Sequence, residues 1–205
     1  MASKDKTRKA AIRRKTKETS IEGTLVLDGK GTGKIKTGLP FLDHMLSLWT
    51  KHGLFDLTLK AKGDLQVDRH HTNEDLGIAL GQSVNKALGN KAGIRRFGTS
   101  YVPMDGTLVR VVIDISGRPF LNGVWSEKPL FFSGSSKGYQ IEDAQHLLQA
   151  FVNEARVTMH VAILAADVDL HHVLEAIFKA FGRALSEAVG RDPKVRGVPS
   201  TKGRL

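Results

Sequence analysis

The chain has 205 residues, of which 40% are hydrophobic, and a formal net charge of +10 with no cysteine. This length fits one domain or two small halves with a shared core, and the lack of cysteine excludes disulfides, cysteine-ligated zinc and thiol catalysis. No stretch approaches the roughly 20 apolar residues of a membrane span, and the basic N-terminus lacks a signal-peptide core, so we expect a cytoplasmic globular enzyme.

The positive charge is concentrated at the two ends of the chain. Residues 1–17 contain eight Lys or Arg against Asp5, and residues 191–205 contain five against Asp192, which leaves residues 18–190 close to neutral. We predict a basic tail at each end, with two α+β halves between them at 18–92 and 93–190. Charge in tails, rather than across a folded face, disfavours duplex binding, so we expect neither nucleic acid nor membrane as a partner.

The elements of the first half follow from periodicity. A hairpin-like run, IEGTLVLDGKGTGKIKTG, opens it at residues 21–38. Residues 39–49, LPFLDHMLSLW, have helical apolar spacing, and residues 54–63, LFDLTLKAKG, alternate as a strand does. A second helix follows in EDLGIALGQSVNKALG, residues 74–89.

The second half repeats this order. Its hairpin-like run is GTLVRVVIDISGRPFL (106–121), its first helix IEDAQHLLQAF (141–151), its strand RVTMHVAIL (156–164) and its last helix EAIFKAFGRALSEAVG (175–190). The insert at residues 122–140 is predicted to be a loop or an edge hairpin.

A constant displacement of 101 residues relates the last helices of the two halves. It aligns Glu74 with Glu175, Gly81 with Gly182, and Gly89 with Gly190, the last pair standing where glycine ends helices. Each half thus reads strand, strand, helix, strand, helix. We predict an α+β fold made by internal duplication, with the helices of the two halves packed back to back around one core.

Both copies place two adjacent histidines before the glutamate, in DRHHTNED and DLHHVLEA. Neighbouring side chains on a helix point about 100° apart, so adjacent histidines serve two ions better than one. The second histidine and the glutamate are i,i+3 and are predicted to share an ion, and a further histidine lies upstream in each half. The predicted sets are His44, His71, Glu74 and His171 for one ion, and His70, His146, His172 and Glu175 for the other.

Three imidazoles and one carboxylate suit a borderline divalent ion and leave two positions of an octahedral ion open for chemistry. A single histidine such as His44 would be better explained as a core or surface residue. Six of the eight histidines fall into the duplicated pattern, which favours metal binding. His52 and His160 lie outside it and are expected to serve structure or hydrogen bonding.

The motifs FLDHML, DRHHTNEDLGIALGQ, GIRRFG, PMDG, SGRPF, HHVLEAIFKAF and STKG together resemble those of the imidazoleglycerol-phosphate dehydratases of histidine biosynthesis, from about Arg14 to the C-terminus. The resemblance implies two similar β-β-α-β-α halves of the ribosomal protein S5 domain 2-like kind. It implies a lyase with two Mn²⁺ per active site that dehydrates imidazoleglycerol phosphate to imidazoleacetol phosphate through an imidazolate held by both ions. A homo-oligomeric cage of 24 subunits is also implied.

The resemblance suggests further roles. Glu18 is a candidate acid/base that contacts substrate, and Glu74 and Glu175 are ligands that could also take a proton; Asp105 is a weaker candidate. Arg96 and Arg118 match phosphate contacts. Lys179 is either a helix partner of Glu175 or a phosphate contact, and Ser200 and Lys202 lie on a tail that could close over the anion.

Some positions depart from the family pattern, namely Leu48, Arg69, Gly106, Thr107 and Asp169, and none of them is a proposed ligand. Two other functions stay open. Another dinuclear-metal enzyme, a hydrolase or phosphatase, would release inorganic phosphate. A nucleic-acid-binding scaffold would bind in a strongly salt-dependent way that persists after chelation.

Overall fold

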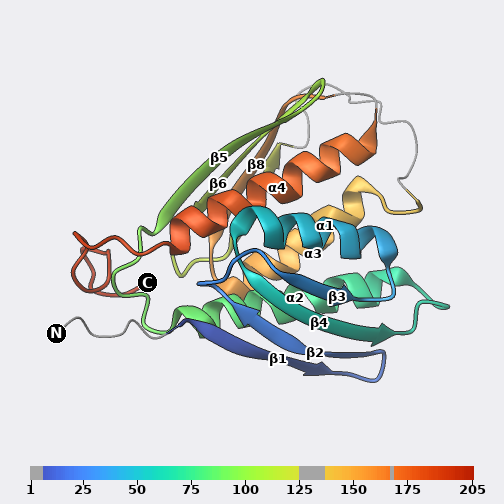
Figure 1. Cartoon of the computed structure of the whole chain (residues 1–205), viewed down its shortest axis with the longest axis horizontal. Helices are drawn as coiled ribbons and strands as arrows, with labels where there is room; N and C mark the ends of the chain where they lie inside the picture. The colour runs from blue at the N-terminus through green and yellow to red at the C-terminus, as the bar shows by residue number, and fades with distance from the viewer. Residues whose placement is uncertain (1–6, 125–136, 167–168) are drawn as a thin grey trace.

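The computed structural model describes residues 7–124, 137–166 and 169–205, and these form two halves of the same order (Figure 1). The elements of the first half are β1 (Lys9–Lys15), β2 (Thr19–Val26), β3 (Gly33–Lys36), α1 (Pro40–Gly53), β4 (Asp56–Gly63) and α2 (Arg69–Leu88). Those of the second are β5 (Phe97–Met104), β6 (Thr107–Asp114), β7 (Phe120–Val124), α3 (Ile141–Ala155), β8 (Thr158–Ala165) and α4 (Leu170–Val189). The duplicated α+β fold is confirmed.

Each half contains a four-stranded mixed sheet, in the order β1-β2-β4-β3 and β5-β6-β8-β7. The expected hairpins within 21–38 and 106–121 are wrong, because β3 and β7 do not pair with the strands before them. Each crosses instead to the far edge and pairs in parallel, β3 with β4 and β7 with β8. In the first half, Asp56 holds the loop before β3 by accepting bonds from the backbone N–H of Lys30 and Thr32.

The expected N-terminal tail at 1–17 is also wrong where the structure describes it. Residues Lys9–Lys15 form β1 and pair antiparallel with β2. Ala10 and Ile12 enter the core while Lys9 and Arg13 face solvent, an alternation that the sequence KAAIRRK already contains. Part of the basic charge therefore lies across a sheet face rather than in a tail.

The C-terminal segment is likewise attached to the fold rather than free. Gly93 donates its backbone N–H to the carbonyl of Gly197, and the Arg96 guanidinium donates to the carbonyl of Pro199. The predicted insert lies mostly at residues 125–136, which are outside the described residues. Within the described chain, no helix is long and apolar enough to cross a membrane.

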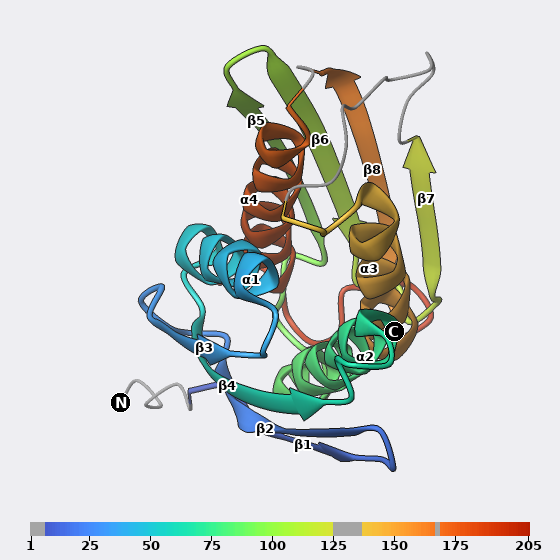
Figure 2. The same cartoon turned by 90° about the vertical axis from the view of Figure 1, so that its right-hand side faces the viewer.

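The helices lie between the two sheets, α2 against α3 and α1 against α4 (Figure 2), and one hydrophobic cluster runs through both halves. Close helix contact depends on glycine. A Cβ at Gly81 would lie 2.5 Å from the Phe151 carbonyl oxygen, and one at Gly182 would lie 2.5 Å from that of Trp49. These helix pairs bring the start of α2 near α3, and the start of α4 near α1.

Candidate functional site

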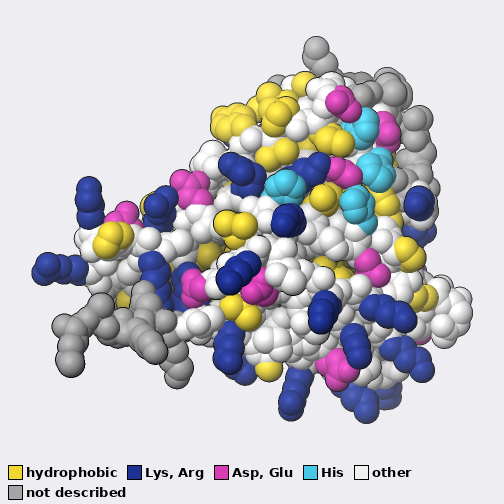
Figure 3. Space-filling model, in the orientation of Figure 1, with side chains coloured by type: hydrophobic (Ala, Val, Ile, Leu, Met, Phe, Trp, Pro, Cys, Tyr) yellow, Lys and Arg dark blue, Asp and Glu magenta, His cyan; other side chains and the backbone are white. Residues whose placement is uncertain are grey.

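Histidine side chains gather on one face of the molecule, where the cyan atoms lie close together (Figure 3). Three side chains from two helices meet at one point: His44 of α1, and His171 and Glu175 of α4. Nε2 of His44 lies 2.9 Å from Oε1 of Glu175, and Nε2 of His171 lies 3.1 Å from the same oxygen. Each offers one ligand atom, and the three atoms lie within 4.8 Å of one another. We call these residues cluster A.

Cluster A has the geometry of a partial metal site. Ligand atoms about 2.1 Å from a shared ion lie about 3 to 4 Å from each other, and the two nitrogen–oxygen distances fit adjacent positions. The His171 ring is packed against Phe41, with ring centroids 5.4 Å apart in an edge-on arrangement. Two imidazoles and one carboxylate are suitable donors for a borderline divalent ion.

The Asp169 side chain caps α4 by accepting a bond from the backbone N–H of His171, and this fixes where His171 and Glu175 stand on the helix. Within cluster A, the glutamate meets the histidine four positions before it, and the predicted sharing of an ion at i,i+3 stays a prediction. At about 100° per residue, a side chain four positions on returns to within about 40° of the first, whereas three positions leave about 60°. Glu175 therefore joins His171 and His44, a place that the prediction had given to Glu74.

Glu175 is held as a carboxylate by its neighbours. Its burial would raise its pKa, but a hydrogen bond from Lys179 and contacts with His44 and His171 lower the pKa to about 2. Nζ of Lys179 lies 2.5 Å from Oε2 of Glu175. The carboxylate thus has one oxygen on the imidazoles and the other on an ammonium, and it is charged at any pH where a metal would bind.

The duplicated residues of the other half form a looser group, which we call cluster B: His70 and Glu74 of α2 with His146 of α3. The His70 and His146 rings are 4.9 Å apart between centroids, and Nε2 of His70 lies 3.9 Å from Oε2 of Glu74. Asp68 caps α2 as Asp169 caps α4. Glu74 is 53% exposed, against 10% for Glu175, so cluster B has the same residues in a more open arrangement.

The second histidine of each pair lies outside its own cluster. The His70 and His71 rings are nearly perpendicular, as are those of His171 and His172. Nδ1 of His71 lies 3.0 Å from Oδ2 of Asp64, and this hydrogen bond raises the pKa of His71, as does the nearby charge of Glu18. His172 has a longer contact, 3.6 Å from Nδ1 to Oδ2 of Asp105. Asp64 stands seven residues before its partner, and no sequence motif marks it as a contact of His71.

The two remaining histidines lie elsewhere. His52 is an exposed residue of α1. Partial desolvation of its ring and the nearby charge of Lys179 lower its pKa. His160 is exposed on β8 and lies 3.4 Å from the Asn122 amide.

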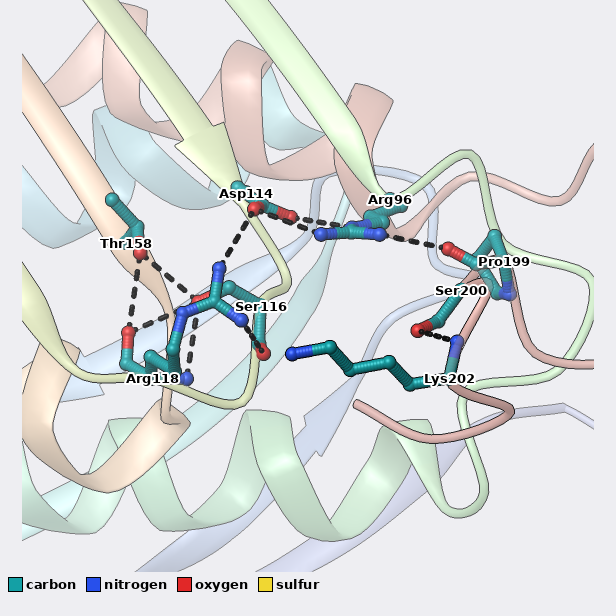
Figure 4. A network of polar contacts seen from close by, with 8 residues as sticks. All are labelled: Arg96, Asp114, Ser116, Arg118, Thr158, Pro199, Ser200 and Lys202. Carbon is teal, nitrogen blue, oxygen red and sulfur yellow. Dashed lines mark hydrogen bonds and ion pairs between the residues drawn. The ribbon is translucent and has the colours of Figure 1, made fainter.

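Four of the predicted phosphate contacts gather around the end of β6, namely Arg96, Arg118, Ser200 and Lys202 (Figure 4). Asp114 organises them, because it accepts two bonds from the Arg96 guanidinium and lies 3.9 Å from that of Arg118. The bond to Asp114 raises the pKa of Arg96. The Lys202 side chain extends toward the loop of Ser116 and Arg118. In this group, which we call the arginine group, Arg118 and Lys202 are exposed cations suited to an oxyanion, whereas Arg96 is paired with Asp114.

The arginine group lies far from cluster A within one chain. The backbone N–H of Arg96 donates to the carbonyl of Ala188, at the end of α4. Glu175 stands thirteen residues earlier on the same helix, which corresponds to about 20 Å. The remaining predicted cation, Lys179, is on the cluster A side. One chain therefore holds the expected phosphate contacts in two separate places.

Three of the five positions that depart from the family pattern have structural contacts here. Asp169 caps α4, Arg69 lies 3.9 Å from the Asp143 carboxylate, and Leu48 is half-buried against the core.

Comparison with known proteins supports the family resemblance that the sequence motifs indicate. The family model described as imidazoleglycerol-phosphate dehydratase matches residues 37–185. The enzymes of that name from Thermoanaerobacter pseudethanolicus and Bacillus subtilis are 52% and 50% identical, each over 97% of this chain and 100% of their own length. The crystal structure of the Staphylococcus aureus protein has a TM-score of 0.77 at 36% identity and covers 89% of this chain. That of the Pyrococcus furiosus protein, in complex with (S)-C348, has a TM-score of 0.79 at 34% identity and covers 95%. Both crystallised chains are covered completely. On this evidence, the chain belongs to the imidazoleglycerol-phosphate dehydratase family.

Proposed function

We propose that this protein is a hydro-lyase that removes water from imidazoleglycerol phosphate to give imidazoleacetol phosphate, in histidine biosynthesis. One observation carries the proposal: a chain of this family twice places two histidines and a glutamate at the start of a helix pair, once as cluster A and once as cluster B. A planar ring with two nitrogens is a substrate that matches two similar sites. The cytoplasmic location stays a prediction.

We propose Mn²⁺ as the cofactor, with two ions per active site. The donors fit, since imidazole and carboxylate together bind first-row divalent ions and Mn²⁺ among them. His44, His171 and Glu175 would hold one ion, and His70, His146 and Glu74 the other. Bound in this way, the ions would supply Lewis acidity and orientation for the imidazole ring.

The chain's own side chains would perform the remaining tasks. Lys179 stands one turn from Glu175 and would turn its ammonium to the substrate once a metal replaces it on the carboxylate. Glu18 is exposed next to β2 and close enough to His71 to shift its pKa, which suits a group that moves a proton beside cluster B. The arginine group would bind the phosphate through guanidinium and ammonium donors.

A homo-oligomer is part of the proposal. About 20 Å separates the arginine group from cluster A along α4, and this span exceeds the length of an imidazole ring that carries a three-carbon chain and a phosphate. A complete site would therefore combine the metal clusters of one chain with the arginine group of another. His71 and His172, which lie outside their own clusters, would be the ligands given to neighbours, and the cage of 24 subunits expected for the family would provide these contacts.

The test is an assay of purified protein after chelation, with imidazoleglycerol phosphate as substrate and with Mn²⁺ added back. We expect imidazoleacetol phosphate to form only after metal addition, with no inorganic phosphate. The exposed Glu22 on β2 provides a matched control, because Glu22→Gln should keep full activity. Release of inorganic phosphate without the keto product would show that the protein is a metal-dependent phosphatase and not a dehydratase. Full turnover in the presence of chelator would show that the reaction does not need a metal ion.

A further inference from the structure

A pocket of 390 Å³ lies between the C-terminal ends of α2 and α3 and the C-terminal segment, and this volume is typical of small-ligand sites. Its lining includes Asn85, Lys91, Arg156, Val198 and Arg204. The pocket is remote from the metal clusters, because Glu74 stands near the start of α2 and Gly89 at its end, fifteen residues or about 22 Å later. None of the residues of the arginine group lines it.

All the charged side chains that line this pocket are cationic. Lys91, Arg156 and Arg204 all line it, and in the described part of the chain its lining contains no Asp or Glu side chain. Lys91 is only 6% exposed, and none of the described residues forms a hydrogen bond or ion pair with its ammonium. Lysine is almost never buried in this way without a partner. Burial lowers the pKa of Lys91, and the charge of Arg156 lowers it further.

Helix dipoles explain only part of this arrangement. Lys91 follows the end of α2, and Arg156 is the C-cap of α3, where cations interact favourably with the partial negative charge of a helix terminus. That interaction would be made equally well by an exposed lysine. It does not account for a lysine that is only 6% exposed and lies within the electrostatic reach of a second cation.

We propose that this pocket binds a small multivalent oxyanion, such as phosphate or a phosphate ester, between Lys91, Arg156 and Arg204. The guanidinium groups would bind the oxygens in pairs and the ammonium as a point charge, and the Asn85 side chain would add an amide donor. The anion would be the partner that Lys91 lacks among the described residues.

Anion binding here has a consequence for the neighbouring segment. Val198 and Arg204 flank Ser200 and Lys202 in the same short stretch of chain, so an anion held by Arg204 and Lys91 would fasten this stretch to α2 and α3. If the proposed function holds, the pocket would thereby help to position two of the substrate's phosphate contacts. The binding itself does not depend on that function.

The test uses the metal-loaded full chain and inorganic phosphate, with binding followed by ³¹P NMR titration and by the shift in Tm. Because phosphate should also bind the arginine group, the pocket is tested in an Arg118→Gln background. We expect Lys91→Met in that background to weaken the remaining phosphate binding at least tenfold and to abolish the phosphate-dependent rise in Tm. Lys34→Met, at an exposed position on β3, is the matched control and should change neither.

Two outcomes would overturn the proposal. One is unchanged phosphate affinity in Lys91→Met. The other is a Tm that Lys91→Met lowers equally with and without phosphate, which would show that Lys91 stabilises the fold through the helix dipole and does not bind the anion. Arg204→Gln changes an exposed side chain and should reproduce the loss of binding even if Lys91→Met folds poorly. Retention of full activity in Arg118→Gln would count against the proposed phosphate contact, and it would leave the pocket unaffected.

Discussion

Clusters A and B are copies of one arrangement, yet only cluster A is closed. Glu175 is nearly buried and bonded on both oxygens, whereas Glu74 is half exposed and 3.9 Å from its nearest histidine nitrogen. One position contributes to the difference, because the displacement of 101 residues that aligns the glutamates aligns Lys179 with Ile78. An ammonium can hold the carboxylate in place of a metal, and an isoleucine cannot. The two halves thus share the proposed ligands, while the residues around them differ.

The largest predicted effect tests whether the two clusters are equivalent in function. Glu175→Gln and Glu74→Gln should each lower kcat/KM by at least about 10³-fold, since each removes a charged ligand from a site that stabilises charge in the transition state by several kcal/mol. Metal analysis should find one ion fewer per chain in each variant. A glutamine variant with normal metal content and full turnover would remove that residue from the ligand set.

A second prediction separates the clusters by their behaviour without metal. The pKa of Glu175 is about 2 in the folded chain and 4.5 as its ordinary value. A lowered folded pKa contributes stability that is present above pH 4.5 and is lost as the pH falls toward 2, up to about 3 kcal/mol. Urea unfolding of chelated protein across this range should show a larger loss in the wild type than in Glu175→Gln, which keeps only the loss due to other carboxylates with a lowered pKa, such as Asp28 and Asp56.

Glu74→Gln is the matched control for this measurement. Glu74 lies in an open cluster, and no lysine of the described residues forms an ion pair with it, so its replacement should leave the acid dependence of the wild type in place. Lys179→Met should shift the loss to higher pH, because it removes the largest favourable contact of the Glu175 carboxylate. Identical curves for the wild type and Glu175→Gln would show that cluster A is not preorganised.

A third prediction concerns the helix contacts that support each cluster. Gly182→Ala and Gly81→Ala each place a methyl group 2.5 Å from a carbonyl oxygen of the facing helix, and overpacking of this kind costs typically 1 to 3 kcal/mol. The free energy of unfolding should fall in both variants. Gly89→Ala is a useful contrast: its Cβ meets nothing within 4 Å, so its cost comes from a positive φ of 59° alone. Equal stability of Gly182→Ala and the wild type would show that α1 and α4 can separate freely.

Much of this fold could be predicted from the chain, because duplication repeats each signal. The helices around 74–89 and 175–190, the paired histidines and the capping glycines all appear twice at one displacement. The pairing partners of the strands were harder to predict from the sequence. That β3 and β7 cross to the far edge depends on α1 and α3 packing onto the sheets, which local periodicity does not report. Strand β1 was missed because charge concealed the alternation of Ala10 and Ile12.

The sequence also gave too little information to assign each proposed metal ligand to one of the two clusters. The eight metal candidates were found from residue type and spacing, but their division into sets assumed i,i+3 sharing. The caps at Asp68 and Asp169 and the meeting of α1 with α4 decide which carboxylate meets which imidazole, and these are tertiary facts. Asp64 carries no motif near His71 and became visible only when β4 and α2 were placed together.

The smallest predicted effect lies at this Asp64–His71 pair. The carboxylate 3.0 Å from Nδ1 would fix the ring and leave Nε2 for a metal, and loss of such a partner typically lowers metal affinity 10- to 100-fold. Because the bond raises the pKa of His71, Asp64→Asn should also lower that pKa, measured by NMR on chelated protein. Protons would then compete less with metal at pH below about 6.5, so the affinity deficit of Asp64→Asn should shrink as the pH falls.

The counterpart Asp105→Asn should change metal affinity less, since its contact with His172 is longer at 3.6 Å and Asp105 is 71% exposed. An equal loss in both variants would mean that the two halves orient their second histidines alike, and no loss in Asp64→Asn would show that His71 does not depend on this carboxylate.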